Sequence, residues 1–196
     1  MQTFSRGSLL ARGAVLALTA SGAGALAGGA AADVPPDSDL GYARLLVAAD
    51  LLAADFYGRA LAAKVFGAAE QKTLRHAAFN EQEHYAAVAG VLTAAGQTPA
   101  TAADIDFTYP AQAFATRGSI AKLGAELEQL QLGAYLGAAD AVQTEPLRGI
   151  VSRIAANEAQ HLAVFTGLRD DRPLGVSLPL PLAIDAASNA LAAYTS

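Results

Sequence analysis

The sequence predicts an all-α fold, an antiparallel bundle of four long helices. Alanine dominates the 53% of residues that are hydrophobic, 7% are aromatic and β-branched residues are sparse, so helix propensity exceeds strand propensity. Apolar residues recur at intervals of three and four along four long segments. The connections between these segments are short, long and short, as expected for a bundle of two helical hairpins.

The first hairpin is expected in the first half of the chain. Its first helix spans residues 39–66, is capped by Asp37 or Ser38 and ends at Gly67. Its second helix spans residues 68–95 and stops at the glycine and proline that follow. Each helix of this length reaches on the order of 36 to 42 Å, given the rise of an α-helix per residue.

The second hairpin follows a long crossover. Residues 96–118 contain prolines and a glycine without clear periodicity, which indicates a connection that runs the length of the bundle. A third helix is expected over 119–142 with Ser119 as its cap. The fourth is expected to start at a capping Thr144, with a proline in its first turn, and to end near Leu168.

These expectations divide the chain into four parts. Residues 1–32 are an export signal, 33–38 a linker, 39–170 the helical bundle and 171–196 a C-terminal extension. A short final helix is expected over 184–194. With 196 residues, the chain has enough hydrophobic material for one well-buried domain and hardly enough for two.

The N-terminal segment has the build of an export signal. Arg6 and Arg12 precede a weakly apolar stretch that ends in small residues, and cleavage after Ala32 or Ala27 fits. Gly7 stands where a twin-arginine signal has its second arginine, so the export route stays open. The alternative is an uncleaved membrane anchor, and no integral membrane domain is expected beyond this segment. The mature protein is therefore predicted in the periplasm, in the cell envelope or outside the cell.

Charge and cysteine content exclude several classes of function. The chain has a net charge of −5, and all of its acidic residues follow the export signal. An acidic chain without a basic cluster argues against nucleic acid as a partner. With no cysteine there is neither a disulfide framework nor a thiolate metal site. Any metal ion must be bound by oxygen and by imidazole nitrogen.

Two copies of one short motif provide candidate metal ligands. "NEQEH" places Glu81 three residues before His84, and "NEAQH" repeats the pattern with Glu158 and His161. Residues three apart project from one face of a helix, so each pair can reach the same metal ion. The chain contains three histidines in all, which makes this repeat hard to attribute to chance.

A dinuclear carboxylate site also needs one acid from each of the other two helices. Asp50 precedes Glu81 by 31 residues, and Glu128 precedes Glu158 by 30 residues, so the two hairpins place their acids at nearly the same offset. Four buried carboxylates without partners would be prohibitively costly, whereas two divalent ions balance their charge. Oxygen and imidazole ligands suit iron first, then manganese, with zinc the least suited.

Neighbouring residues are assigned other roles. Tyr57 and Tyr135 each follow one of the two acids by seven residues on the same face and are candidates to hydrogen-bond a ligand. Glu83 and Glu126 lie about 200° round the helix from the predicted ligands and are expected in solvent. His76 is expected at the surface or between helices.

The pattern resembles the ferritin-like superfamily, over about residues 39–168. The phrases "DLLAADFY", "NEQEHYAAV", "LEQLQLGAYLGAA" and "NEAQH" resemble the exported bacterial ferritin-like domain family that includes desiccation-related proteins. The resemblance implies a dinuclear metal centre between the four helices. The family motif carries over residue by residue onto Glu81, His84, Glu128, Glu158 and His161. Asp50 departs, because it is one methylene shorter than the glutamate usual there.

The resemblance also implies a reaction class, redox chemistry with dioxygen or peroxide. His84 and His161 would each hold one ion, and Glu128 with either Asp50 or Glu158 would bridge or terminally ligate the ions. An open coordination position would accept the oxidant. The alternatives are a non-catalytic structural or stress-related envelope protein and an iron-storage protein. A monomer or small homo-oligomer is expected, since nothing in the sequence specifies a closed cage.

Overall fold

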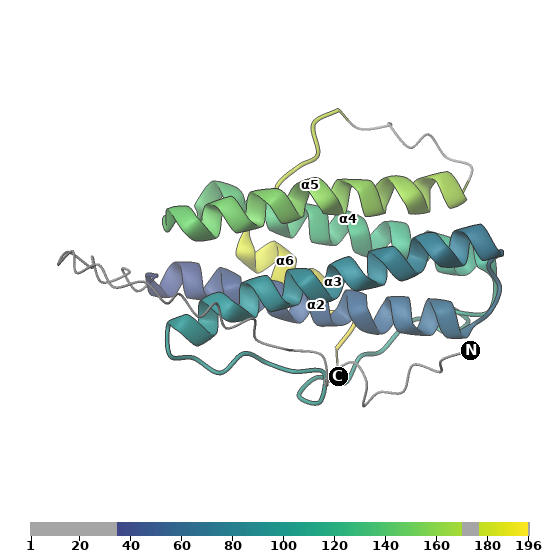
Figure 1. Ribbon diagram of the computed structural model, residues 1–196, viewed down its shortest axis with the longest axis horizontal. Coiled ribbons are helices and arrows are strands. Elements are labelled where there is room, and N and C mark those ends of the chain that lie inside the picture. The colour runs from purple at the N-terminus through teal and green to yellow at the C-terminus, as the bar shows by residue number, and fades with distance from the viewer. Residues whose placement is uncertain (1–34, 170–176, 196) are drawn as a thin grey trace, which may run out of the picture. The chain divides into compact units, whose positions relative to one another are not determined.

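The computed structural model describes residues 35–169 and 177–195, and its secondary structure is helical throughout these ranges apart from one isolated bridge between Phe107 and Thr195. The helices are α2 (Asp37–Ala62), α3 (Ala68–Ala94), α4 (Arg117–Ala141), α5 (Glu145–Leu168) and the short α6 (Ile184–Ala192) (Figure 1). The predicted all-α bundle, with a long crossover in its middle and a short C-terminal helix, is confirmed. The predicted export signal over 1–32 lies outside the described residues.

The boundary between α2 and α3 differs from the prediction. α2 ends at Ala62 rather than at residue 66, because Lys64 adopts a left-handed backbone with φ of 59°. Gly67 does not end α2 but precedes α3 as its N-cap residue. Its N–H donates to Glu70 Oε2 over 2.8 Å, which satisfies one of the backbone groups left free at a helix start.

The predicted caps are also partly wrong. Asp37 and Ser38 lie inside α2, which begins directly after Pro36. Ser119 lies inside α4, and the N-cap is Thr116, whose Oγ1 accepts from the Ser119 N–H over 3.0 Å. Composition shows that a capping residue is near, but a shift of one to three residues decides which residue has the extended backbone that a cap needs.

The start of α5 is capped from another helix. Thr144 is its N-cap residue as predicted, but its side chain makes no capping hydrogen bond. Instead the buried carboxylate of Asp39, in the first turn of α2, accepts from the N–H of Gln143 and of Thr144, the latter over 2.7 Å. Burial alone would raise the pKa of Asp39, but hydrogen bonds from Thr144 and Gln143 lower it. This contact ties the two hairpins together at one end.

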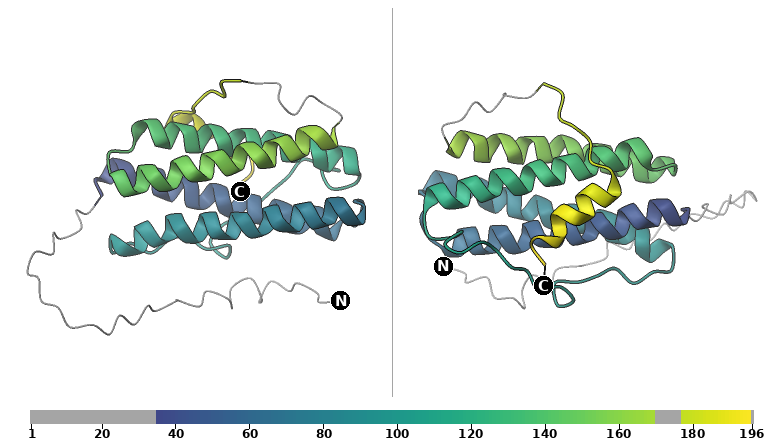
Figure 2. Two further views of the ribbon diagram at one scale, coloured as in Figure 1. Left: turned by 45° about the horizontal axis from the view of Figure 1, so that its top comes forward. Right: turned by 180° about the vertical axis from the view of Figure 1, so that it is seen from behind.

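The two hairpins pair lengthwise, with α2 against α4 and α3 against α5 (Figures 1 and 2). Seen from behind, α6 crosses α4 and α2 (Figure 2, right). The crossover between α3 and α4 is hydrogen-bonded to the first hairpin at two places. Tyr85 on α3 donates to Ala100 O of the crossover, and Tyr109 of the crossover donates to Leu52 O on α2. The face formed by α3 and α5 is crossed by none of the described segments (Figure 1).

The segment before α6 lies directly on α4. The Leu182 N–H donates to Gly133 O over 2.8 Å. A Cβ atom at Gly137 would lie 1.8 Å from Leu182 O, so any side chain there would displace the segment. The glycines of α4 thus allow backbone to pack against backbone.

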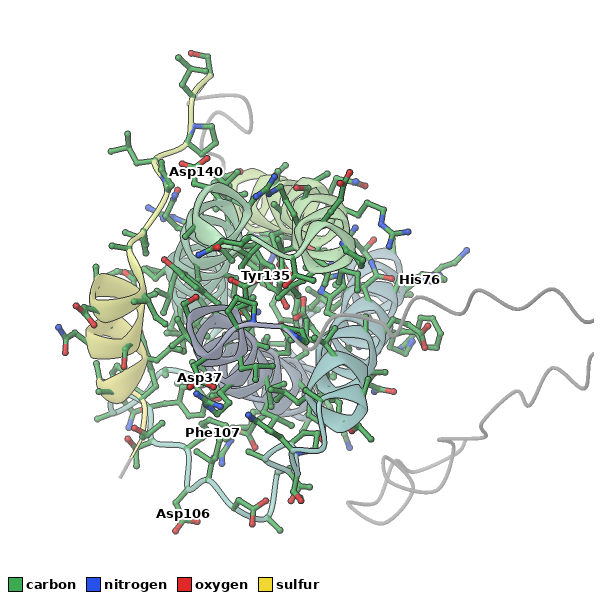
Figure 3. All side chains as sticks on the ribbon, turned by 90° about the vertical axis from the view of Figure 1, so that its left-hand side faces the viewer. Asp37, His76, Asp106, Phe107, Tyr135 and Asp140 are labelled. Carbon is green, nitrogen blue, oxygen red and sulfur yellow. The ribbon has the colours of Figure 1, made fainter. Side chains whose placement is uncertain are left out.

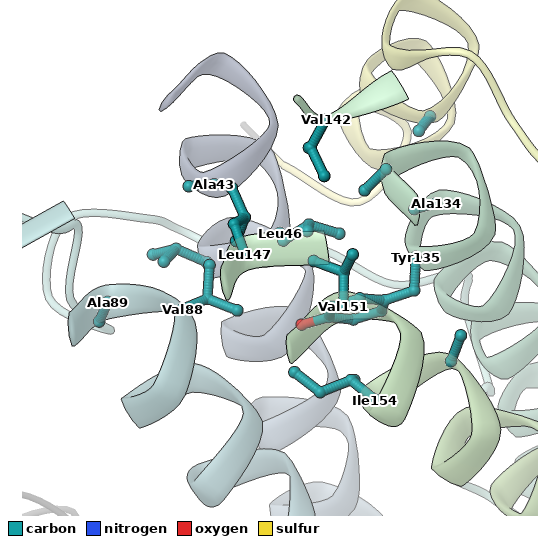
Figure 4. Packing of buried hydrophobic residues seen from close by; sticks show 14 of the residues in the cluster. Ala43, Leu46, Val88, Ala89, Ala134, Tyr135, Val142, Leu147, Val151 and Ile154 are labelled. Carbon is teal, nitrogen blue, oxygen red and sulfur yellow. The ribbon is translucent and has the colours of Figure 1, made fainter. Parts of the chain in front are cut away.

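The core consists of two clusters with different chemistry. One contains mostly aliphatic residues around Tyr135, among them Leu46, Val151 and Ile154 (Figure 4). The other is rich in aromatic rings, and its buried members include Phe56, Tyr57, Phe66 and Phe165. None of the described helices combines the length and hydropathy needed to cross a membrane.

Candidate metal centre

All six predicted ligands lie in the interior, each on the inward face of its helix. α2 contributes Asp50, α4 contributes Glu128, and α3 and α5 contribute the two Glu-x-x-His pairs, Glu81 with His84 and Glu158 with His161. The most exposed of them is His84 at 7%, and the four carboxylate residues are at most 1% exposed. The structure therefore brings together the residues that the sequence grouped by spacing alone.

The donor atoms form two overlapping groups. Asp50, Glu81, His84 and Glu158 form the first, and Glu81, Glu128, Glu158 and His161 the second, with the donor atoms of each group within 4.8 Å of one another. Glu81 and Glu158 belong to both groups. We call the part with Asp50, His84 and Tyr135 the Asp50 side and the part with Glu128, His161 and Tyr57 the Glu128 side. Of the four acids, Glu81 and Glu158 are therefore the ones that could bridge two metal ions.

The donor atoms converge without satisfying one another. His84 Nδ1 lies 2.9 Å from Glu158 Oε1, and His161 Nδ1 lies 2.8 Å from Glu81 Oε1. These atoms, with Glu128 Oε2 and Glu158 Oε2, are nevertheless buried without a partner in hydrogen-bond geometry. An unsatisfied buried polar atom costs about 1–3 kcal/mol. Divalent cations would satisfy the oxygen and nitrogen atoms at once, so the donor set fits such ions.

Protons compensate part of the charge of the cluster. Burial, reinforced by the neighbouring carboxylates, raises the pKa of Asp50 and of Glu128 well above the usual range. Burial opposes a charge on His84 and His161, but the carboxylates beside them prevail and raise their pKa to about 10 and about 12. Burial also opposes ionisation of Glu158, yet the two histidines lower its pKa to about 2. Cations entering the cluster would therefore compete with protons.

Two tyrosines hold the outer acids in a crossed arrangement. Tyr57 on α2 donates to Glu128 Oε1 on α4 over 2.5 Å. Tyr135 on α4 donates to both carboxylate oxygens of Asp50 on α2, over 2.7 and 2.9 Å. Both rings are fully buried, and Tyr135 lies in the middle of the bundle in Figure 3. Burial raises the pKa of both phenols, which keeps them protonated as donors.

Two further polar residues were not predicted from the sequence. Gln131 on α4 donates from Nε2 to Glu81 Oε2 over 3.2 Å. The side-chain amide of Asn80 lies 3.1 Å from His161 Nε2, the ring nitrogen that faces away from the cluster. The position of Gln131, three residues after Glu128 on the same helical face, was a usable signal. The position of Asn80 next to Glu81 gives no such signal, because its partner is on another helix.

The residues expected in solvent are found there. Glu83 and Glu126 are exposed, and Glu126 lies 3.9 Å from Lys122 in an ion pair along the helix. His76 is exposed on the outer side of the bundle, away from the cluster (Figure 3).

Fold and site together define a class, the four-helix bundles that enclose a cluster of carboxylates and histidines. The model of the family described as ferritin-like domain matches residues 38–170, and the chain belongs to this family.

Among solved structures, the chain is similar to the hypothetical protein MJ0754 from Methanococcus jannaschii DSM 2661. The TM-score is 0.60 at 14% sequence identity, over 90% of this chain and 100% of the other. This likeness concerns the fold alone. No protein with a curated description matches the chain.

Proposed function

We propose that the six clustered residues bind two divalent transition-metal ions, and that the centre reacts with dioxygen or peroxide. The observation that carries the proposal is the pair of overlapping donor groups, in which six buried oxygen and nitrogen atoms of Glu128 and the two Glu-x-x-His pairs have no partner in hydrogen-bond geometry. Membership of the ferritin-like family supports the same function. Iron is the metal that suits these ligands best, then manganese, then zinc.

Each residue has a distinct task in this proposal. Glu81 and Glu158 lie between the two positions and would contact both ions, whereas Asp50 and Glu128 would each contact one ion from the outside. His84 and His161 would supply one nitrogen each through Nδ1, the atom that faces the carboxylates. When bound, the ions would supply one-electron redox chemistry and a coordination position for the oxidant.

The surrounding residues orient the ligands and keep bulk water out. Tyr57 and Tyr135 fix the outer carboxylates, and Asn80 fixes the ring of His161 through its outer nitrogen. Such outer contacts typically change metal affinity by about 10–100-fold. The burial of all six ligands favours reactions that must be shielded from solvent.

We further propose that the protein acts outside the cytoplasm. The support is the sequence of residues 1–32, with two arginines, an apolar stretch and a small-residue end near Ala32. Sequencing of the N-terminus of protein recovered from the cell envelope would test this proposal. An N-terminus at Met1 or Gln2 would contradict it.

Metal analysis tests the central proposal. Protein matured in its own export pathway should contain close to two equivalents of iron or manganese per chain, and a His84→Ala/His161→Ala variant should contain almost none. Equal metal content in the two proteins would refute the metal centre.

Two further measurements separate the candidate activities. Oxygen consumption on addition of Fe(II) separates a redox centre from a non-catalytic scaffold, which the shorter Asp50 favours. Light scattering tests iron storage, because a species no heavier than the full chain of 19.9 kDa, or a dimer of it, excludes a cage.

A further inference from the structure

We propose that a surface pocket between α3 and α5 is the entrance through which a small uncharged oxidant, such as dioxygen or hydrogen peroxide, reaches the Asp50 side of the centre. The inference rests on the proposed function and names the route and the kind of molecule for the same site. The pocket has a volume of about 280 Å³ and is lined by Glu83, His84, Ala87, Ile150, Arg153 and Ile154.

One residue, His84, belongs both to the lining of the pocket and to the centre. His84 lines the pocket and is also a member of the first donor group, with Nδ1 directed to Glu158. Its side chain is 9% exposed, against 4% for His161 and 0% for Glu81 and Glu158. His84 is therefore the only one of the six clustered residues that lines this pocket, and a molecule there lies against a ligand of the Asp50 side.

The two sides differ at the outer edge of the histidine ring. The outer nitrogen of His161 faces the amide of Asn80, which closes that side. The ring of His84 borders the pocket instead. The pocket also lies on the face of the bundle that none of the described segments crosses, whereas α6 covers the opposite face (Figures 1 and 2). Of the two histidines in the cluster, His84 is thus the one that borders a surface pocket.

The lining of the pocket selects the kind of molecule that enters. Its walls are the alkyl side chains of Ala87, Ile150 and Ile154, and its rim has one carboxylate, Glu83, and one guanidinium, Arg153. A rim of opposite charges has no net sign that would concentrate cations or anions. A volume of about 280 Å³ is ample for a molecule of a few atoms, so dioxygen or hydrogen peroxide fits without any movement of the walls.

An Ala87→Trp variant tests the entrance. A long side chain on a helix leans over the preceding turn, so an indole at position 87 would cover Glu83 and His84. The matched control is Ala94→Trp, which adds the same indole at an exposed position of α3 away from the pocket. The probe is nitric oxide, a neutral diatomic of the size of dioxygen, added to the Fe(II)-loaded protein in a stopped-flow spectrometer.

We expect nitric oxide to associate about tenfold more slowly with the Ala87→Trp protein, because the indole blocks the route to the centre. The iron content and the amplitude of the absorbance change should stay the same. The Ala94→Trp protein should bind nitric oxide at the wild-type rate. A wild-type rate in Ala87→Trp with normal iron loading would overturn the entrance and leave the metal centre intact. Failure of the wild type to bind Fe(II) would instead refute the proposed function.

A second variant covers the case in which Ala87→Trp does not fold. Ile150→Ala should widen the pocket, and the Fe(II) protein should then distinguish less between hydrogen peroxide and the bulkier tert-butyl hydroperoxide. The ratio of the two oxidation rates should fall several-fold relative to wild type. An unchanged ratio in a folded, iron-loaded Ile150→Ala protein would overturn the proposal.

Discussion

The Asp50 side and the Glu128 side share one ligand pattern but have different surroundings. Each tyrosine contacts the histidine of its own side, with ring centres 6.0 Å apart for Tyr57 and His161 and 6.3 Å apart for Tyr135 and His84. On the Glu128 side, the ring of Tyr57 also lies 5.4 Å from Phe56 and 5.7 Å from Phe165 between ring centres. On the Asp50 side, Tyr135 packs among aliphatic side chains, as Figure 4 shows.

The two sides also differ in polar contacts. The Glu128 side has a longer acid and the contact between Asn80 and His161. The Asp50 side has the shorter acid and borders the pocket at His84. An internal repeat can thus keep its ligand pattern and its tyrosine donors while the packing and the other polar contacts around them diverge. We expect the Glu128 side to bind its ion more tightly and the Asp50 side to exchange ions and ligands faster.

Removing one aromatic ring should destabilise the Glu128 side. Phe165 is fully buried, and a Cβ at Gly124 would lie 2.5 Å from its ring, so the fit is tight. We expect Phe165→Ala to lower the free energy of unfolding by about 3–5 kcal/mol. The control on the Asp50 side, Ile154→Val, should cost about 0.5–1.5 kcal/mol. Urea unfolding of the metal-free proteins measures both, and equal losses would contradict the assigned difference in packing.

The two crossed tyrosines test each side separately. Tyr57→Phe removes the donor to Glu128, and Tyr135→Phe removes the donor to Asp50. Each variant should weaken the ion on its own side by about 10–100-fold and leave the other nearly unchanged. Competition with a chelator measures both affinities. Tyr85→Phe, which loses only a hydrogen bond to the crossover, is the control; a similar loss there would show that the effect is not local.

The amide of Asn80 should matter on one side alone. Asn80→Ala removes the contact with His161 Nε2, and we expect the affinity of the Glu128 side to fall about tenfold. Asn157→Ala is the matched control, since Asn157 stands in the same place before Glu158. Metal titration of both variants gives the result. Equal effects would mean that the two sides are more alike than the structure shows.

Lengthening Asp50 by one methylene should have the smallest effect of these substitutions. Asp50→Glu restores the glutamate that the family resemblance implies, and the added methylene extends its reach toward the ion. We expect the affinity of the Asp50 side to rise by a few fold, since crowding of the buried site offsets part of the gain. Chelator competition checks this. A loss of affinity would show that the site is built around aspartate.

The six clustered residues could be predicted from the sequence, because the face on which each residue lies is fixed by its position along its own helix. The i,i+3 spacing of Glu81 and His84 fixes their common face, and the second copy points to a second helix. The contact of Asn80 with His161 could not be predicted, because helical periodicity gives a face but not the neighbour across the bundle. The same holds for Gly137 beneath Leu182, and for the pocket at His84.

The helix ends were missed for a different reason. Gly67 and Ser119 have the composition of end residues, but the backbone angles of nearby Lys64 and the extended Thr116 decide where the helices stop and start. Such choices depend on differences of about 1 kcal/mol in local capping.

A cobalt titration tests the central claim most directly. Co(II) added to the metal-free protein should give visible absorption that rises to two equivalents per chain in two unequal steps. His161→Ala should lose the tighter step and His84→Ala the weaker one. A single equivalent, two equal steps, or the same loss in both variants would contradict a dinuclear centre with a firmly held Glu128 side and an open Asp50 side.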